Sequence, residues 1–221
     1  MRLRDRASAG NRLAPSLSSH LGDDALLVGL APGGVIVAHA IAALVPAAVD
    51  VLVTRGVHAP GHPHFLIGAV ASGIVLMNRP LMRQLRASRA YVDTAIAKAA
   101  QEVADAEFRY RGGREADSVD GRTVILVDDG LASDKAVRVA IASLRQRGPE
   151  RLIFASPFCD AQQAEMIQTI ADEVVCLHYP RPYRGGHLFY DRLEEVVAAE
   201  VQQCVQFEEF EQPDELFAVY A

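Results

Sequence analysis

The 221-residue chain is 50% hydrophobic and 23% charged, and its formal net charge is −6. This composition supports a folded domain with a substantial core and excludes an intrinsically disordered chain. Basic residues are scattered among acids instead of forming a stripe, which argues against DNA or RNA as a partner.

The N-terminal region contains no signal for secretion. The first 20 residues lack a continuous apolar segment, so we predict a cytoplasmic protein without a signal peptide. Residues 25–49 carry no Lys, Arg, Asp or Glu and are long enough to cross a bilayer. However, Pro32, Gly33 and Gly34 interrupt this segment, and His39 falls in its middle. These residues favour a strand, a glycine turn and a buried helix, and we predict no contact with a membrane.

Short apolar runs alternate with helical patterns along most of the chain. The runs are residues 26–30, 49–53, 124–127, 152–155 and 174–177, and the helical patterns are residues 35–44, 133–146 and 161–171. This alternation is typical of an α/β protein with a mainly parallel central sheet and helices on both faces.

An insertion separates the second and third predicted core strands. Residues 65–76 form two apolar runs around Ser72-Gly73, which predicts a β-hairpin. Residues 80–108 then keep a helical period, which predicts one long helix. The polar, glycine-bearing residues 109–121 are expected to loop back to the central strand.

Residues 207–221 depart from this pattern because they mix aromatic residues with acids. Two interpretations stay open: a frayed tail, or a segment that docks onto the body or onto a second subunit. Cys159, Cys176 and Cys204 lack the spacing of metal ligands. We therefore expect them to be reduced thiols with a structural role.

Residues 124–133 contain the strongest functional signal in the sequence. They read as a buried strand that ends in Asp128 and Asp129, followed by a glycine turn and the start of a helix. At the carboxyl end of a parallel strand, two carboxylates can accept hydrogen bonds from vicinal sugar hydroxyls. The free backbone amides of the next helix can bind a phosphate. The alternative is a simple helix cap provided by Ser133.

The sequence of residues 124–133 resembles the phosphoribosyl pyrophosphate (PRPP) motif of type I phosphoribosyltransferases. Other segments of the chain resemble a bacterial stand-alone subgroup of that family. The matching segments are Asp5-Arg6, Ala9-Gly10, Leu13-Ala14, Gly29-Leu30, Gly33-Gly34-Val35, Ala59-Pro60-Gly61, Pro63, Gly68-Ala69-Val70, Gly121-Arg122, residues 172–177 and Tyr190-Asp191. The resemblance implies the type I phosphoribosyltransferase fold over residues 1–203, with a hood at about residues 178–203. Residues 204–221 would form an acidic aromatic tail.

The resemblance also implies a chemistry and a set of site residues. In such enzymes a nucleophile attacks the anomeric carbon of Mg²⁺-bound PRPP and releases pyrophosphate, while cations and amides stabilise the leaving group. The ligand would be a small phosphorylated ribose or nucleotide, Mg²⁺ would accompany PRPP, and family members often form homodimers. The implied residues are Asp128 and Asp129 as the catalytic, ribose-binding acids; Gly130, Leu131, Ala132, Ser133, Asp134, Lys135 and Ala136 as the 5-phosphate loop; Ala31, Pro32, Gly33 and Gly34 as the pyrophosphate turn; and Arg55, His62 and His64 as the flap.

Several positions depart from the family pattern. The phosphate loop reads Ser133-Asp134-Lys135-Ala136, where the family favours Thr-Gly-x-Thr, and Asp134 adds a carboxylate beside a phosphate dianion. The subgroup's Arg, Lys and Glu are replaced by Pro32, Gly56 and His64. Two function classes therefore stay open: a phosphoribosyltransferase, or a non-catalytic protein that keeps the fold to bind a nucleotide-like ligand or another protein.

Other kinds of site receive less support. His58, His62 and His64 could bind a metal, but no nearby Cys, Asp or Glu completes the set, so we assign no metal ligand and favour a solvated flap. Gly29, Gly33 and Gly34 do not have dinucleotide-fold spacing, and neither a P-loop nor a G-x-S-x-G elbow occurs.

Residues 179–187 follow the last predicted strand and carry Arg181, Arg184 and His187. Two interpretations stay open: an exposed loop, or a hood that covers a planar or anionic acceptor.

Overall fold

The core is an all-parallel, five-stranded sheet, seen in a computed structural model that describes residues 1–22 and 24–205. Its order is β2-β1-β6-β7-β8. The strands are β1 (Leu26–Leu30), β2 (Ala48–Leu52), β6 (Thr123–Val127), β7 (Arg151–Phe158) and β8 (Glu173–His178). The predicted parallel sheet is confirmed, and all five predicted runs are strands whose ends differ by at most a few residues. β6, which precedes the two acids, lies at the centre of the sheet.

Helices cover both faces of this sheet, as predicted. α1 (Arg6–Leu17) and α2 (Gly33–Ala42) pack on one face, where Leu27 and Ile125 are buried. α5 (Asp134–Gln146) and α6 (Ala161–Ile167) pack on the other, against Leu26 and Leu126. The opposite burial of adjacent strand residues follows from the two-residue period of a strand. α6 is shorter than the predicted 161–171 because the chain tightens after Ile167: the Thr169 amide donates to the Met166 carbonyl oxygen at 3.1 Å, and the Ile170 amide donates to the Ile167 carbonyl oxygen at 2.9 Å.

The N-terminal helix α1 was not predicted, although its start carries a local signal. The Ser8 amide donates to Asp5 Oδ1 at 2.8 Å, and the Asp5 amide donates to Ser8 Oγ at 3.0 Å. Such a reciprocal cap satisfies two otherwise free donors. α1 also packs closely on α2, because a Cβ on Gly10 would lie 2.4 Å from the Val37 carbonyl oxygen. The cap makes Arg6 the first residue of the helix.

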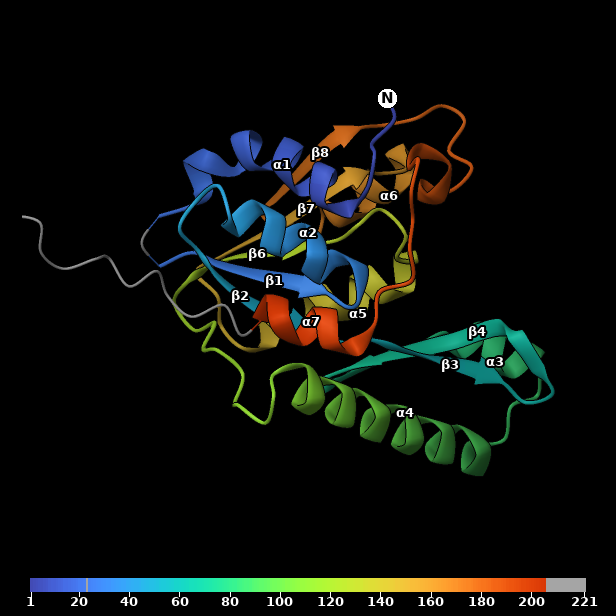
Figure 1. Cartoon of the computed structure of the whole chain (residues 1–221). Helices are drawn as coiled ribbons and strands as arrows, with labels where there is room; N and C mark the ends of the chain where they lie inside the picture. Colours follow the sequence, from blue (N-terminus) through green and yellow to red (C-terminus); the bar gives the residue numbers. More distant parts are fainter. Residues whose placement is uncertain (23, 206–221) are drawn as a thin grey trace, which may run out of the picture.

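The insertion forms a second, antiparallel sheet of β3 (Arg55–Ala59), β4 (His62–Ala71) and β5 (Ile74–Met77). The predicted hairpin is confirmed as β4–β5, and its turn is Ser72-Gly73, where Gly73 has φ 77°. β3 adds a strand that was not predicted. Figure 1 shows this sheet projecting from the body of the molecule with the long helix α4 lying along it.

The prediction of a single helix over residues 80–108 is wrong. The chain forms α3 (Arg79–Gln84) and α4 (Arg89–Tyr110). Between them, Arg86 adopts φ 51°, and Ser88 Oγ accepts a hydrogen bond from the Tyr91 amide at 3.3 Å. A left-handed residue ends one helix and a serine cap begins the next, so the apolar period spans two helices.

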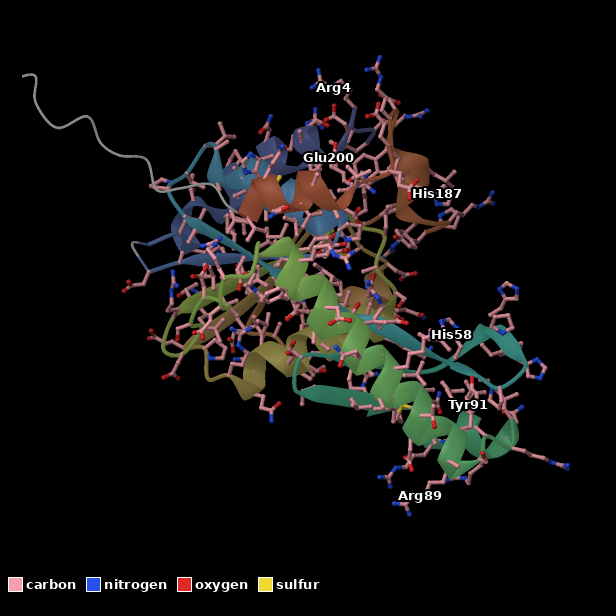
Figure 2. The ribbon with its side chains drawn as sticks, turned by 60° about the horizontal axis from the view of Figure 1, so that its bottom comes forward. Arg4, His58, Arg89, Tyr91, His187 and Glu200 are labelled. Carbon is pink, nitrogen blue, oxygen red and sulfur yellow. The ribbon has the colours of Figure 1, made fainter. Side chains whose placement is uncertain are left out.

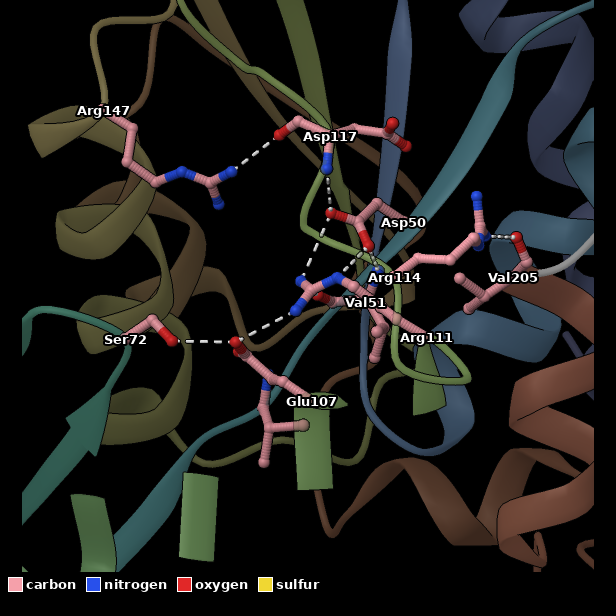
Figure 3. Close-up of polar contacts among 10 residues, drawn as sticks. Asp50, Val51, Ser72, Glu107, Arg111, Arg114, Asp117, Arg147 and Val205 are labelled. Carbon is pink, nitrogen blue, oxygen red and sulfur yellow. Dashed lines mark hydrogen bonds and ion pairs between the residues drawn. The ribbon is translucent and has the colours of Figure 1, made fainter. Parts of the chain in front are cut away.

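A buried ionic network ties the insertion to the central sheet (Figure 3). Arg111 donates from Nε to Asp50 Oδ1 at 2.7 Å and from Nη1 to Glu107 Oε2 at 3.3 Å. Glu107 also accepts from the Ser72 hydroxyl at 2.8 Å and from the Val53 amide at 2.9 Å. Burial alone would lower the pKa of Arg111, but the hydrogen bonds and charges of Asp50 and Glu107 raise it. The network fixes the carboxyl end of β2.

The last described segments are a short turn of 3₁₀ helix at Gly186–Phe189 and α7 (Ala198–Val205), which packs against α2 and α4. A further 3₁₀ turn, Ser18–His20, follows α1. α7 runs across the predicted boundary between residues 203 and 204, and the predicted tail from residue 206 onward lies outside the described residues. The three cysteines form no disulfide. Within residues 1–22 and 24–205, no helix is long and apolar enough to span a membrane.

Candidate functional site

A pocket of about 240 Å³ lies at the carboxyl ends of β1 and β6. The chain proceeds from β1 outward to β2 and from β6 outward to β7, so the pocket lies where the strand order reverses. Open α/β sheets bind their ligands at such a point. The lining residues are Arg6, Leu30, Ala31, Pro32, Gly33, Thr54, Asp128, Asp129, Leu131, Ala132 and Ala136.

Most of the predicted acid pair, phosphate loop and pyrophosphate turn meet at this pocket. Asp128, Asp129, Leu131, Ala132 and Ala136 line it from the β6 side, and Ala31, Pro32 and Gly33 line it from the β1 side. Gly34, Gly130, Ser133, Asp134 and Lys135 adjoin these residues in the chain but are not among those that line the pocket. The structure thus places two segments about 100 positions apart in the sequence against one cavity, because β1 and β6 are neighbours in the sheet.

Backbone hydrogen bonds hold the two acids in a tight turn after β6. The Gly130 amide donates to Asp128 Oδ2 at 2.8 Å, and the Leu131 amide donates to Asp129 Oδ1 at 3.1 Å. Gly130 has φ 82°, which a residue with a side chain rarely adopts. Asp128 and Asp129 are only 4% and 5% exposed. A ligand would therefore meet two carboxylates of fixed orientation.

The environment of Asp128 opposes its ionisation. Burial, together with the negative charge of Asp129, raises the pKa of Asp128 to about 7, and hydrogen bonds from backbone amides counteract only part of this shift. Near neutral pH the carboxyl group therefore exchanges between its neutral and ionised forms. Such a group can either donate a hydrogen bond to a ligand oxygen or accept one from a hydroxyl.

Arg6 supplies a cation that the sequence analysis did not assign to the site. Its Nε lies 2.8 Å from Asp129 Oδ2, and its Nη1 donates to the Glu194 carbonyl oxygen at 2.7 Å. The side chains of Arg6 and Asp129 are 13% and 8% exposed, so solvent screens this ion pair weakly. The capping pattern at Asp5 and Ser8 could have indicated a helix that begins at Arg6, but not its contact with Asp129.

Two glycines at the start of α2 allow the β1 turn to approach the acids. A Cβ on Gly33 would lie 1.8 Å from Asp129 Oδ2 and 2.7 Å from Arg6 Nε. A Cβ on Gly34 would lie 2.3 Å from the Val127 carbonyl oxygen. No side chain fits at either position without displacing its neighbours.

Gly33→Ala should therefore separate Arg6 from Asp129 and distort the pocket. We expect the free energy of unfolding to fall by about 1–3 kcal/mol, as is usual for overpacking of a close contact. Urea denaturation would measure the loss. Gly22→Ala is the matched control, because a Cβ there meets nothing within 4 Å. Equal stability of the two variants would contradict the close approach of Gly33 to the ion pair.

Two tyrosines of the C-terminal region hold the acid turn from outside. The Tyr183 hydroxyl donates to the Gly130 carbonyl oxygen at 2.9 Å, and the Tyr190 hydroxyl donates to the Asp129 carbonyl oxygen at 2.8 Å. Burial and the charge of Asp128 raise the pKa of Tyr183 to about 12, and burial with the charge of Asp129 also raises that of Tyr190. Both therefore stay protonated donors at neutral pH. Neither role was predicted, since the contacts join segments more than 50 residues apart.

The remaining loop residues form the start of α5. Ser133 Oγ accepts a hydrogen bond from the Ala136 amide at 3.3 Å, so the helix-cap role considered in the sequence analysis is present. It coexists with the acid turn instead of replacing it. Asp134, the first residue of α5, is exposed at the helix N-terminus.

The predicted flap residues lie on the insertion and are not among the residues that line the pocket. Arg55 begins β3, directly after the lining residue Thr54, and its Nε lies 3.8 Å from Glu102 Oε2. His62 and His64 are exposed on β4. Figure 2 shows His58 beside Tyr91, whose hydroxyl donates to the His58 carbonyl oxygen at 3.1 Å. In the described part of the chain, no three His, Cys, Asp or Glu side chains are grouped to hold a metal ion.

The three basic residues of the predicted hood, Arg181, Arg184 and His187, are exposed and are not among the residues that line the pocket. In Figure 2, His187 lies at the outer surface of the body. Within the predicted hood, Tyr183 and Tyr190 are the residues that contact the acid turn, through the Gly130 and Asp129 carbonyl oxygens.

Comparisons with known proteins agree with this architecture. A family model described as the phosphoribosyl transferase domain matches residues 3–183. Two curated proteins of Mycobacterium tuberculosis, from strains CDC 1551 and H37Rv, are each named "Putative phosphoribosyl transferase" and are 32% identical to the chain over 177 residues. The match covers 80% of this chain but only 40% of either relative. The chain therefore spans less than half the length of these curated relatives.

A solved structure is similar over almost the whole chain. The protein TT1426 from Thermus thermophilus is 31% identical and superimposes with a TM-score of 0.77. The match covers 93% of this chain and 98% of TT1426. The parallel sheet, its flanking helices and the projecting insertion thus belong to an architecture known from experiment.

Proposed function

Because the chain belongs to the phosphoribosyl transferase family, we propose that the pocket at β1 and β6 binds a small phosphorylated ribose, either PRPP or a ribose 5-phosphate-bearing nucleotide. One observation carries the proposal: two buried, oriented carboxylates lie at the centre of the sheet, between the N-termini of α2 and α5. Carboxylates bind sugar hydroxyls, and helix N-termini bind phosphates. A pocket of about 240 Å³ has room for a ligand of pentose size.

The acid turn is the ribose-binding element of this proposal. Asp129 accepts from Arg6 through Oδ2 and from an amide through Oδ1, so its orientation is fixed before a ligand arrives. Asp128, whose pKa is raised to about 7 by burial and by the charge of Asp129, can be neutral or ionised near neutral pH. Together they would contact the two vicinal hydroxyls of the ribose. This geometry is set by the fold, which lowers the entropy lost on binding.

The start of α5 is the proposed 5-phosphate element. Leu131, Ala132 and Ala136 line the pocket beside the N-terminus of this helix, and the helix dipole favours negative charge there. Asp134 opposes this attraction, because its carboxylate stands at the same helix end. We therefore expect phosphate affinity below that of a loop without an acid.

Mg²⁺ fits the site as a companion of the ligand. It commonly binds through one or two carboxylates plus substrate phosphates, and Asp128 and Asp129 provide such carboxylates. When bound, it would neutralise the charge of the pyrophosphate. Transfer would then break the bond between the anomeric carbon and pyrophosphate while a new bond forms to the nucleophile.

We further propose a cytoplasmic homodimer in which residues 1–203 form the ligand-binding domain.

The proposal is tested by calorimetric titration with PRPP, in the presence and absence of Mg²⁺, and with ribose 5-phosphate. An assay of pyrophosphate release then follows. We expect both ligands to bind, and Asp134→Gly with Ala136→Thr to tighten ribose 5-phosphate about tenfold, because a repelling carboxylate leaves the helix end and a hydroxyl is gained. Lys98→Gln, far along α4, is the control and should change neither affinity. If titration with PRPP and titration with ribose 5-phosphate both give no heat of binding, the proposed function is refuted.

The second candidate is a non-catalytic protein that binds the same ligand as a signal. The absence of a cation at Pro32 and Gly56, together with Asp134, favours it, since these positions weaken the grip on phosphates. The two candidates differ in one measurement. Binding of PRPP without release of pyrophosphate supports the non-catalytic protein, and release in the presence of an acceptor supports the transferase.

A further inference from the structure

Arg6 is the one positively charged residue among those that line the pocket in the described part of the chain. The other charged lining residues are Asp128 and Asp129, and the rest are uncharged. PRPP, with its 5-phosphate and its pyrophosphate, would bring several negative charges into this cavity. Mg²⁺ bound with the ligand would offset some of them, and among the lining residues the protein's own cation is Arg6.

The side chain of Arg6 lies on one particular side of the pocket. Its Nε would be 2.7 Å from a Cβ on Gly33, which places the guanidinium against the turn between β1 and α2. The start of α5, with Ala132 and Ala136, forms the other side. If the 5-phosphate binds at α5, then Arg6 is at the opposite end of the ribose, where the anomeric carbon and its substituent lie.

The hydrogen bonds of Arg6 use two of its three guanidinium nitrogens. Nε contacts Asp129 and Nη1 donates to the Glu194 carbonyl oxygen, whereas Nη2 makes no hydrogen bond to any residue in 1–22 or 24–205. The side chain is 13% exposed, so the two existing bonds hold the group rigidly in a mostly dry environment. An arginine held in this way is suited to bind phosphate oxygens.

We propose that Arg6 is the specificity-determining cation that binds the anomeric pyrophosphate of PRPP, with Asp129 holding its guanidinium in place. The inference rests on the proposed function and names the group that recognises one end of the ligand. It also explains how the site manages without cations at Pro32 and Gly56: the charge comes from the first turn of α1. Ribose 5-phosphate lacks the pyrophosphate and should depend on Arg6 only through its support of Asp129, and therefore much less than PRPP does.

The inference is tested by calorimetric titration of three proteins: the wild type, Arg6→Gln and Arg6→Lys. Each is titrated with Mg²⁺-PRPP and with ribose 5-phosphate. Charge-assisted hydrogen bonds to phosphate predict that Arg6→Gln weakens PRPP about 10- to 100-fold and ribose 5-phosphate less than about threefold. Arg6→Lys keeps the charge and should lie between. Arg12→Gln, exposed on the same helix, is the matched control and should alter neither affinity.

The outcomes separate the inference from the proposed function. An equal loss of both ligands in Arg6→Gln and Arg6→Lys would show that Arg6 only supports Asp129, and unchanged PRPP affinity would show that it does not meet the pyrophosphate; either overturns the inference. A wild type that binds ribose 5-phosphate but not PRPP overturns the inference and leaves the proposed function standing. A wild type that binds neither overturns both.

Discussion

Arg111→Met should lower the free energy of unfolding by about 3–5 kcal/mol, because it leaves Asp50 and Glu107 buried without their cation. For a chain of this size, such a loss lowers the melting temperature by roughly 10 °C or more. Methionine keeps most of the packed volume, so the effect isolates the charge. Thermal unfolding followed by circular dichroism, together with urea denaturation, would measure it.

Two further variants distinguish a buried-charge effect from general damage. Arg109→Met alters an exposed arginine in the last turn of α4, two residues before Arg111, and should change stability by less than about 0.5 kcal/mol. Arg111→Met combined with Asp50→Asn and Glu107→Gln should be more stable than Arg111→Met alone, because no unpaired charge stays buried. If Arg111→Met by itself were as stable as the wild type, the ionic network would contribute no net stability.

Arg111→Met should also weaken ligand binding, although Arg111 is not among the pocket-lining residues. The network holds Val51 and Val53 near the end of β2, and the lining residue Thr54 follows them. Looser packing there would widen the pocket. The network therefore links the position of the insertion to the shape of the site.

Asp128→Asn should stabilise the protein at pH 8 and should have a clearly smaller effect at pH 5. In the folded state the pKa of Asp128 is raised to about 7 from 3.8, so the fold favours the protonated carboxyl. The stability that this group contributes is therefore full below about pH 4 and is lost as the pH rises through 7. Asparagine is neutral at every pH and keeps an oxygen for the Gly130 amide. We expect a gain of about 2–4 kcal/mol at pH 8.

The same substitution should weaken ligand binding, because the site loses a carboxylate that accepts from a sugar hydroxyl. A charge-assisted hydrogen bond corresponds to about a 10- to 100-fold loss of affinity for ribose 5-phosphate. Urea denaturation at the two pH values and calorimetry would measure both effects. Asp24→Asn changes an exposed carboxylate and serves as the control. A stability difference between variant and wild type that does not change with pH would exclude Asp128 as the titrating group.

A gain in stability with a loss of binding would identify Asp128 as a residue kept for function. Burying a carboxylate beside Asp129 costs stability, and the oxygen of asparagine can still accept the hydrogen bond of the Gly130 amide. The opposite result, a less stable and fully binding variant, would assign Asp128 a structural role.

The secondary structure was largely readable from local patterns. Each of the five core strands is a short apolar run, and β1 was predicted with its observed bounds, Leu26–Leu30. Errors arose where a polar cap outweighs an apolar period. Ser88 begins α4 inside what looked like one helix, and Asp5 with Ser8 begins α1 in a segment without a clear apolar run. Capping is decided by one or two hydrogen bonds, which hydrophobic periodicity does not report.

For the site, the amino-acid order was enough to identify which carboxylates lie at the end of a central parallel strand and which helix follows them. That information is local, because burial and a glycine turn fix the direction of Asp128 and Asp129 within a few residues. The packed fold was needed to pair Arg6 with Asp129 and to bring Tyr183 and Tyr190 against the turn. Contacts between segments about 50–120 residues apart depend on how whole elements pack, and no pattern within one segment encodes its partner.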